Sequence, residues 1–167
     1  MSFTNVLTAL AATGGIGDFR PLASLEELAE KHGRPSDSGR GSSEHEWPYW
    51  LRYGDVRLEA CECRIVHSLQ LETWNDTVTI PADRFGEYVA LEASTTFRHL
   101  ESGLLVAGVS WTTITRRPDQ FTLEVEAPHA TVHFTFVTGG DDEESGKDDA
   151  LLYGVTAQEF THWCGQS

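Results

Sequence analysis

The sequence of 167 residues lacks any long hydrophobic run. No stretch approaches the ~18 consecutive apolar residues of a membrane-spanning helix, and the N-terminus has neither the basic nor the apolar region of a secretory signal peptide. The sequence therefore predicts a cytoplasmic protein with no membrane partner. A secreted protein whose signal peptide has already been removed would show the same pattern.

Basic residues are also scarce, because 12 Lys and Arg stand against 26 Asp and Glu and give a formal net charge of −14. Phosphate contacts need a basic surface, so this composition argues against direct nucleic-acid binding. An acidic surface instead speeds the encounter with positively charged molecules. We therefore expect a basic protein partner.

Cysteine is rare and odd in number. Cys61 and Cys63 fall in a predicted strand, where residues two apart have Cα atoms roughly 6.5–7 Å from each other, at the limit for a disulfide. Without a disulfide framework a reducing compartment is favoured. The alternative is a zinc site of Cys61, Cys63 and His67, with His162 and Cys164 as further ligands, but Cys-x-Cys-x3-His is not a strong zinc spacing. We expect thiols that behave as small hydrophobes, and no metal or other cofactor.

Signature motifs of common enzyme classes are missing from the sequence. It has no Walker loop, His-Glu-x-x-His, Gly-x-Ser-x-Gly, Cys-x-x-Cys pair or kinase motif. His129 and His133 flank the end of a predicted hairpin, but no Ser or Cys stands in a recognisable relation to either one. We expect no catalytic residue. The alternative is a small enzyme or ligand-binding protein with a pocket between helices and sheet, using His67 or His133.

Apolar residues at helical spacing predict short helices. A first helix is expected over residues 2–12. A second begins at Ser24, which forms a capping box with Glu27. A third is expected after Ser94, and Thr156 is expected to cap a terminal helical turn.

Alternation of apolar and polar residues predicts antiparallel strands between these helices. The polar segments 34–46 and 139–149 have no apolar period and are expected to be surface loops. The expected strands lie at 56–60, 63–71, 77–80, 121–125, 132–136 and 150–155, with an extended segment from about residue 109.

Helix followed by strands occurs twice, so the single domain of residues 1–167 has candidate pseudo-repeats at 14–82 and 83–167. Alternating strands also generate sequence echoes without duplication. We expect an α+β fold of short helices packed on antiparallel sheet, with a tandem duplication as a hypothesis. The echoes are Leu58-Glu59 with Leu123-Glu124, and Val66-His67 with Val132-His133.

Two surface features favour recognition of another protein. The aromatic segment 47–50 stands beside a Gly/Ser-rich loop, where aromatic rings can anchor an interface, although they can instead cover the core. The acidic run 141–144 can steer a cationic partner, or only keep its loop solvated. The residues expected to bind a partner are Trp47, Tyr49, Trp50, Asp141, Asp142, Glu143 and Glu144.

Three segments resemble small bacterial immunity proteins of polymorphic-toxin systems: Gly17–Pro21, Leu25–Gly33 with Pro35 after it, and Tyr53–Leu58. The resemblance covers about the first third of the chain and, less specifically, residues 94–136. It implies a cytoplasmic protein that occludes the active site of a cognate toxin, so that the basic partner is a toxin domain. The helix-plus-sheet order is also similar to β-lactamase inhibitory proteins, but their secretion and disulfides are not indicated. An adaptor that docks through its acidic loop is a third hypothesis.

Overall fold

A computed structural model describes residues 2–41, 43–44, 46–82, 85–139, 146–162 and 164. Within these residues the predicted α+β class is confirmed. The helices are α1 (Phe3–Thr13), α2 (Leu25–His32), α3 (Phe97–Val106) and the short 3-10 helix η1 (Lys147–Asp149). The strands are β1 (Asp37–Arg40), β2 (Tyr49–Tyr53), β3 (Val56–Ala60), β4 (Val66–Glu72), β5 (Thr77–Pro81), β6 (Tyr88–Glu92), β7 (Thr112–Arg117), β8 (Gln120–Ala127), β9 (Ala130–Val137) and β10 (Leu151–Gln158).

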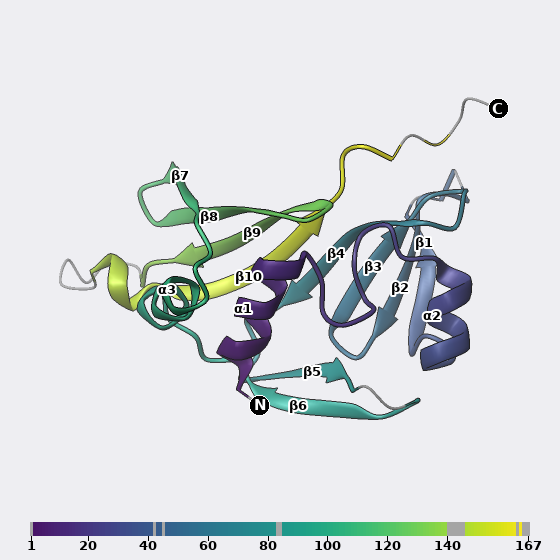
Figure 1. Ribbon diagram of the computed structural model, residues 1–167, viewed down its shortest axis with the longest axis horizontal. Coiled ribbons are helices and arrows are strands. Elements are labelled where there is room, and N and C mark those ends of the chain that lie inside the picture. Colours follow the sequence, from purple (N-terminus) through teal and green to yellow (C-terminus); the bar gives the residue numbers. More distant parts are fainter. Residues whose placement is uncertain are drawn as a thin grey trace.

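Eight of these strands form one antiparallel sheet in the order β1-β2-β3-β4-β10-β9-β8-β7 (Figure 1). One helix followed by four strands occurs twice, since α2 precedes β1 to β4 and α3 precedes β7 to β10. The two halves meet where β4 pairs with β10. The hairpin of β5 and β6 forms a separate two-stranded sheet and separates the two halves in sequence.

The sequence echoes do not follow this symmetry of topology. The strand order makes β3 equivalent to β9 and β4 equivalent to β10. The echoing dipeptides instead lie in β3 and β8, and in β4 and β9. Strand alternation accounts for them, and the duplication itself stays a prediction.

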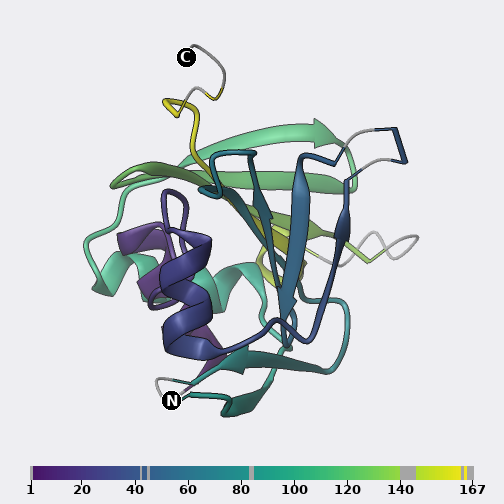
Figure 2. The same cartoon turned by 90° about the vertical axis from the view of Figure 1, so that its right-hand side faces the viewer.

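The main core lies between one face of the large sheet and the helices, which Figure 2 shows on the same side of that sheet. Leu7 and Leu10 of α1 are fully buried, as are Leu100 and Leu104 of α3. Full burial of a side chain of this size contributes about 1.5–3 kcal/mol. An aromatic cluster lies beneath α3, with ring centroids 5.3–5.7 Å apart, and consists of Phe97, Phe121 and Phe136.

Two of the helix starts are confirmed and one is corrected. Ser2 caps α1, and Ser24 caps α2 by accepting from the amide of Glu26 rather than from that of Glu27. Thr96, not Ser94, caps α3 through the His99 amide, at 3.4 Å. The start moves because the Phe97 amide donates to the Ala150 carbonyl, which fixes the chain beside β10.

Two segments predicted as irregular or helical are strands. Residues 37–40 of the expected loop 34–46 form β1, an edge strand whose largely exposed side chains show no apolar alternation. Thr156 lies within β10 and caps no helix, because apolar burial continues to Ala157. In the other expected loop, residues 147–149 form η1, and residues 140–145 lie outside the described part of the chain.

Candidate functional site

The face of the large sheet that points away from the helices is polar, and within the described residues no helix covers it (Figure 2). Apolar residues alternate with polar ones along β2, β3 and β9, which places the polar set on this face. We call it the open face. One row of paired residues crosses it from β1 to β7: Asp37, Arg52, Arg57, Gln70, Thr156, His133, Glu124 and Thr112.

In the first half of the sheet, an aromatic ring and an arginine pack together on the open face. The ring of Trp50 lies against Gly39 of the edge strand, where an added Cβ would be 2.8 Å from the ring. The Arg57 guanidinium lies 5.4 Å from the centre of the same ring and donates to Glu59 at 3.2 Å. Arg57 and Glu59 are 31% and 26% exposed, so these side chains are held in place and still reach the surface.

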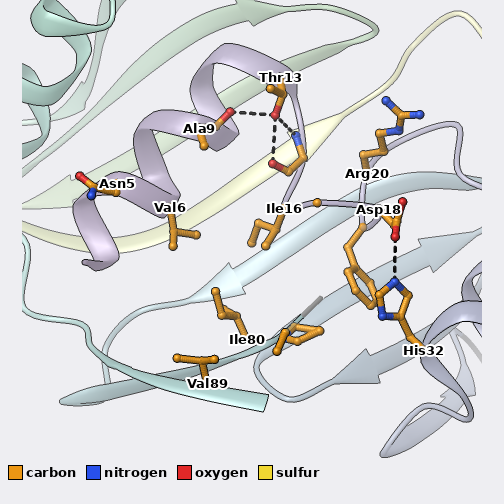
Figure 3. Close-up of a pocket in the computed structure, with 15 residues that line it drawn as sticks. Asn5, Val6, Ala9, Thr13, Ile16, Asp18, Arg20, His32, Ile80 and Val89 are labelled. Atoms are coloured by element: carbon orange, nitrogen blue, oxygen red, sulfur yellow. Dashed lines mark hydrogen bonds and ion pairs between the residues drawn. The ribbon is translucent and has the colours of Figure 1, made fainter. Parts of the chain in front are cut away.

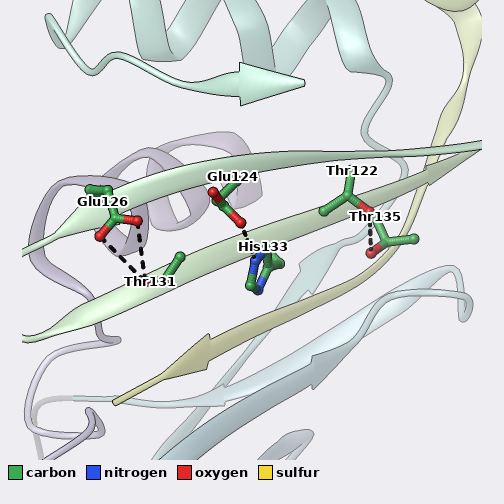
Figure 4. A network of polar contacts seen from close by, with 6 residues as sticks. All are labelled: Thr122, Glu124, Glu126, Thr131, His133 and Thr135. Atoms are coloured by element: carbon green, nitrogen blue, oxygen red, sulfur yellow. Dashed lines mark hydrogen bonds and ion pairs between the residues drawn. The ribbon is translucent and has the colours of Figure 1, made fainter. Parts of the chain in front are cut away.

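In the second half, polar pairs link β8 and β9 on the open face (Figure 4). His133 Nε2 lies 3.0 Å from Glu124 Oε2, and the Thr131 hydroxyl donates to the Glu126 carboxylate. Neither Ser nor Cys contributes a side chain to this network (Figure 4). The hydrogen-bond partner of His133 in this network is therefore a carboxylate, and the threonine hydroxyls bond to Glu126 or to each other.

The predicted aromatic segment divides between two faces of β2. Trp47 and Tyr49 pack against the core with ring centroids 5.9 Å apart, and the Tyr49 hydroxyl donates to Ser38. Trp50 points the other way because successive strand residues alternate. Of the three, only Trp50 therefore lies on the open face.

The acidic run Asp141, Asp142, Glu143 and Glu144 lies outside the described residues. Of the acidic residues that follow it, Asp148 pairs with Arg98 of α3 at 2.7 Å. Both side chains are more than half exposed, so this ion pair contributes little stability.

An exposed aromatic pair that sequence reasoning missed lies at the junction of the two halves. Trp74 follows β4, and its ring centroid is 5.5 Å from that of Tyr153 in β10. They are 53% and 51% exposed, and they border a cavity of about 340 Å³. Tyr153 reaches this position because the β9–β10 register shifts between Leu152 and Gly154. The turn residues Asn75-Asp76 could have indicated that Trp74 lies at a strand end. The register shift that exposes Tyr153 has no sequence signature.

A cavity of about 670 Å³ lies between α1, the loop after it, α2 and the β5–β6 hairpin (Figure 3). Asp55 holds this hairpin against the β2–β3 turn, because its amide donates to the Thr79 carbonyl and its carboxylate accepts from the Thr79 amide, both at 2.7 Å. The cavity lies between helices and the small β5–β6 sheet. Its lining includes neither His67 nor His133.

The histidine at this cavity is His32, whose Nε2 lies 3.0 Å from Asp18 Oδ2 (Figure 3). Hydrogen bonds from Lys31 and then His32 hold the pKa of the Asp18 carboxyl below its ordinary value. His32 is buried with its ring centroid 4.5 Å from that of Phe19. The one hydroxyl in the lining, that of Thr13, donates to backbone carbonyls.

The three cysteines are free thiols, and the strand predicted to hold two of them is interrupted. Residues 61–65 form the turn between β3 and β4, in which the Cys61 amide donates to Ile65 and the Arg64 amide to Cys61. Arg64 has a φ of 59°, in the left-handed region. The strand geometry expected for Cys61 and Cys63 is therefore wrong, because both residues lie in a turn.

This turn brings Cys61 and Cys63 to His162 and Cys164, which follow β10. His162 Nε2 lies 3.4 Å from Cys61 Sγ and 3.1 Å from Cys164 Sγ. Burial raises the pKa of the Cys61 thiol, and its hydrogen bond with Cys164 adds to the shift. His67, the ligand that the sequence suggested, is outside this cluster.

Comparisons with known proteins add no assignment to these sites. No family model matches the chain, and comparison with curated protein sequences and with solved structures finds no match either.

Within the described residues, no helix has the length and apolar character needed to cross a membrane.

Proposed function

We propose that this protein is a non-catalytic binding protein that neutralises a cognate protein, specifically an immunity protein that occludes a basic bacterial toxin domain. The observation that carries the proposal is the open face, an eight-stranded polar surface with no covering helix among the described residues. A surface of this width can cover a partner's active site without chemistry of its own.

The packing of Trp50 supports a role as an interface anchor. Trp and Arg dominate measured hot spots, and here Gly39 and Arg57 confine the ring from two sides. Side chains that are already ordered lose less conformational entropy on binding. The pair of Trp50 and Arg57 is therefore the centre of the proposed interface, and Trp74 with Tyr153 is a second aromatic contact at the junction of the halves.

The charge of the chain supports a basic partner. A net charge of −14 accelerates the encounter with a cationic domain and repels other acidic proteins. We expect the run Asp141 to Glu144 to act on association. Replacing these four residues by Asn and Gln should slow association at low salt and have less effect at high salt.

A growth assay tests the proposal. The domain encoded beside this gene is taken as the candidate toxin and is expressed in a bacterial host, with and without this protein. We expect growth arrest without it, rescue with it, and a one-to-one complex in size-exclusion chromatography. Rescue should fail for Trp50→Ala/Arg57→Ala and persist for Arg98→Ala, a matched arginine on α3. Absence of a complex with a folded neighbouring domain would refute the proposal.

The cavity at Asp18 and His32 favours a second candidate function, binding of a small ligand. Its volume of about 670 Å³ lies within the usual range for small-molecule sites. A thermal-shift screen of metabolites should then find a compound that stabilises the wild type. The same compound should fail to stabilise Ala9→Phe, a variant whose new ring would occupy the cavity. A stabilised Ala9→Phe variant would place the ligand elsewhere.

A further inference from the structure

A compact set of soft ligand atoms lies where the β3–β4 turn meets the segment after β10. The ligand atoms of Cys61, Cys63, His162 and Cys164 all lie within 4.8 Å of one another. Tetrahedral zinc, with bonds of about 2.3 Å to sulfur and about 2.0–2.1 Å to nitrogen, places its ligands about 3.6–3.8 Å apart. Side-chain shifts of about 1 Å would bring these four atoms to that geometry.

The donor types select the class of ion. Three thiolates and one imidazole form a Cys3His set, which is typical of structural zinc, whereas magnesium and calcium prefer oxygen ligands. Four protein ligands complete a tetrahedron and leave no position for a reacting water. The set therefore suits an ion that stabilises structure.

Backbone contacts on both sides bring the ligands together from positions 101 residues apart. On one side is the tight turn that presents Cys61 and Cys63. On the other, the Glu159 amide extends the pairing with β4 by donating to the His67 carbonyl at 3.0 Å. The carboxylate of Glu159 then accepts from the backbone amides of Thr161 and His162, which turns the chain toward Cys61.

Among the described residues of this segment, apolar packing does not explain why it stays beside the turn. Phe160, the large apolar residue in the described part of residues 159–164, is 70% exposed. Cys61, His162 and Cys164 are half-buried, and Cys63 is exposed. A metal bond supplies the cohesion that such a segment lacks, because binding free energy at a structural site is folding free energy.

We propose that Cys61, Cys63, His162 and Cys164 bind one Zn²⁺, which ties the segment after β10 to the β3–β4 turn. The thiol protons leave to solvent as the three sulfur–metal bonds form. The site lies outside the cavity at Asp18, and the inference does not depend on the proposed partner. The same side chains could otherwise form a Cys61–Cys164 disulfide, and the test separates the two.

The test uses the full chain, purified under reducing conditions, stripped with a chelator and titrated with Co²⁺ and then Zn²⁺. We expect one Co²⁺ per chain with the intense visible absorption of a tetrahedral thiolate site, displaced by Zn²⁺. Loss of an outer-shell partner costs about 10–100-fold in metal affinity, so Cys164→Ser and His162→Ala should each cost more than about 100-fold. His67→Gln, a histidine of the adjacent strand, should leave the affinity unchanged.

A second readout does not depend on the folding of any variant. Zn²⁺ should slow amide exchange of residues 159–164 in the wild type. Three outcomes would overturn the proposal: no Co²⁺ or Zn²⁺ binding by the folded, reduced chain; a six-coordinate cobalt spectrum; or a native Cys61–Cys164 disulfide in a protein that binds no metal once reduced.

Discussion

The two halves of the large sheet share a topology but differ in what packs against them. In the second half, α3 contributes Phe97, Leu100 and Leu104 to a core that also contains α1 and the rings beneath α3. In the first half, α2 buries only Leu28 and His32 among its eight residues. The loop after α1 and the β5–β6 hairpin cover the remainder of that half.

This difference assigns stability mainly to the second half of the sheet and recognition mainly to the first half. The second half has the larger apolar helix surface, which dominates the free energy of folding. The first half has the cavity, the Trp50–Arg57 pair and the Cys/His turn. We infer that the second half contributes most of the folding free energy, whereas the first half presents the binding side chains.

The largest expected effect comes from matched helix substitutions that compare the two cores. Leu100→Ala in α3 and Leu28→Ala in α2 each remove the same atoms from a buried site. We expect losses in the free energy of unfolding of about 4 kcal/mol for Leu100→Ala and about 2–3 kcal/mol for Leu28→Ala, because the site in α2 can collapse more easily. Urea denaturation measures both. Equal losses would remove the distinction between the halves.

The junction of the halves provides the next test. Thr73, which is buried beyond the end of β4, donates its hydroxyl to the Leu152 carbonyl of β10 at 2.8 Å. Thr73→Val should cost about 1–3 kcal/mol, because it leaves a buried carbonyl without this donor. Thr131→Val, which removes an exposed threonine–glutamate contact, is the control and should cost under about 0.5 kcal/mol. A loss at Thr73 no larger than the control would show that this bond does not join the halves.

The smallest expected effect is the pH-dependent contribution of Asp18 in the first half. The pKa of this carboxyl lies below its ordinary value of 3.8 in the folded chain, through hydrogen bonds from Lys31 and His32. The charged form therefore stabilises the fold above pH 3.8, and this contribution is lost as pH falls through the lowered value.

Asp18→Asn should accordingly cost under about 1 kcal/mol near pH 6, since Asp18 and Lys31 are both largely exposed. The difference from wild type should shrink as pH falls below 3.8. Denaturation curves at several pH values measure it. A difference that grows toward acid pH would contradict the assigned role.

Local patterns predicted much of the fold. The β8–β9 hairpin follows from strict alternation through Leu123, Val125, Val132 and Phe134, whose buried side chains pair across the strands. The first helix follows from its apolar residues, and the second from its Ser24 cap. The edge strand β1 could not be predicted, because its exposed side chains show no apolar period. It is a strand only through its backbone pairing with β2.

The candidate sites were harder to predict because they depend on turns and on contacts between distant segments. The alternation of Ile65 and Leu69 with polar residues suggested one continuous strand over residues 63–71. Arg64 instead adopts a left-handed conformation, which interrupts that strand. The meeting of this turn with Cys164 requires the pairing of β4 with β10, which sequence patterns did not indicate. Trp50 was selected together with Trp47 and Tyr49 from their place beside a loop, and strand alternation then puts Trp50 on the face opposite the buried Leu51.

The most direct test of the central claim measures by calorimetry how the open-face variants bind the candidate toxin domain of the growth assay. Truncating a central Trp or Arg costs about 2–4 kcal/mol at a hot spot, so Trp50→Ala and Arg57→Ala should each weaken binding by roughly 30- to 1,000-fold. Arg98→Ala and Leu105→Ala, exposed on α3, should change the affinity less than about 3-fold. If the α3 variants weaken binding while folded Trp50→Ala and Arg57→Ala variants bind like wild type, the partner binds the helix side and the account is contradicted.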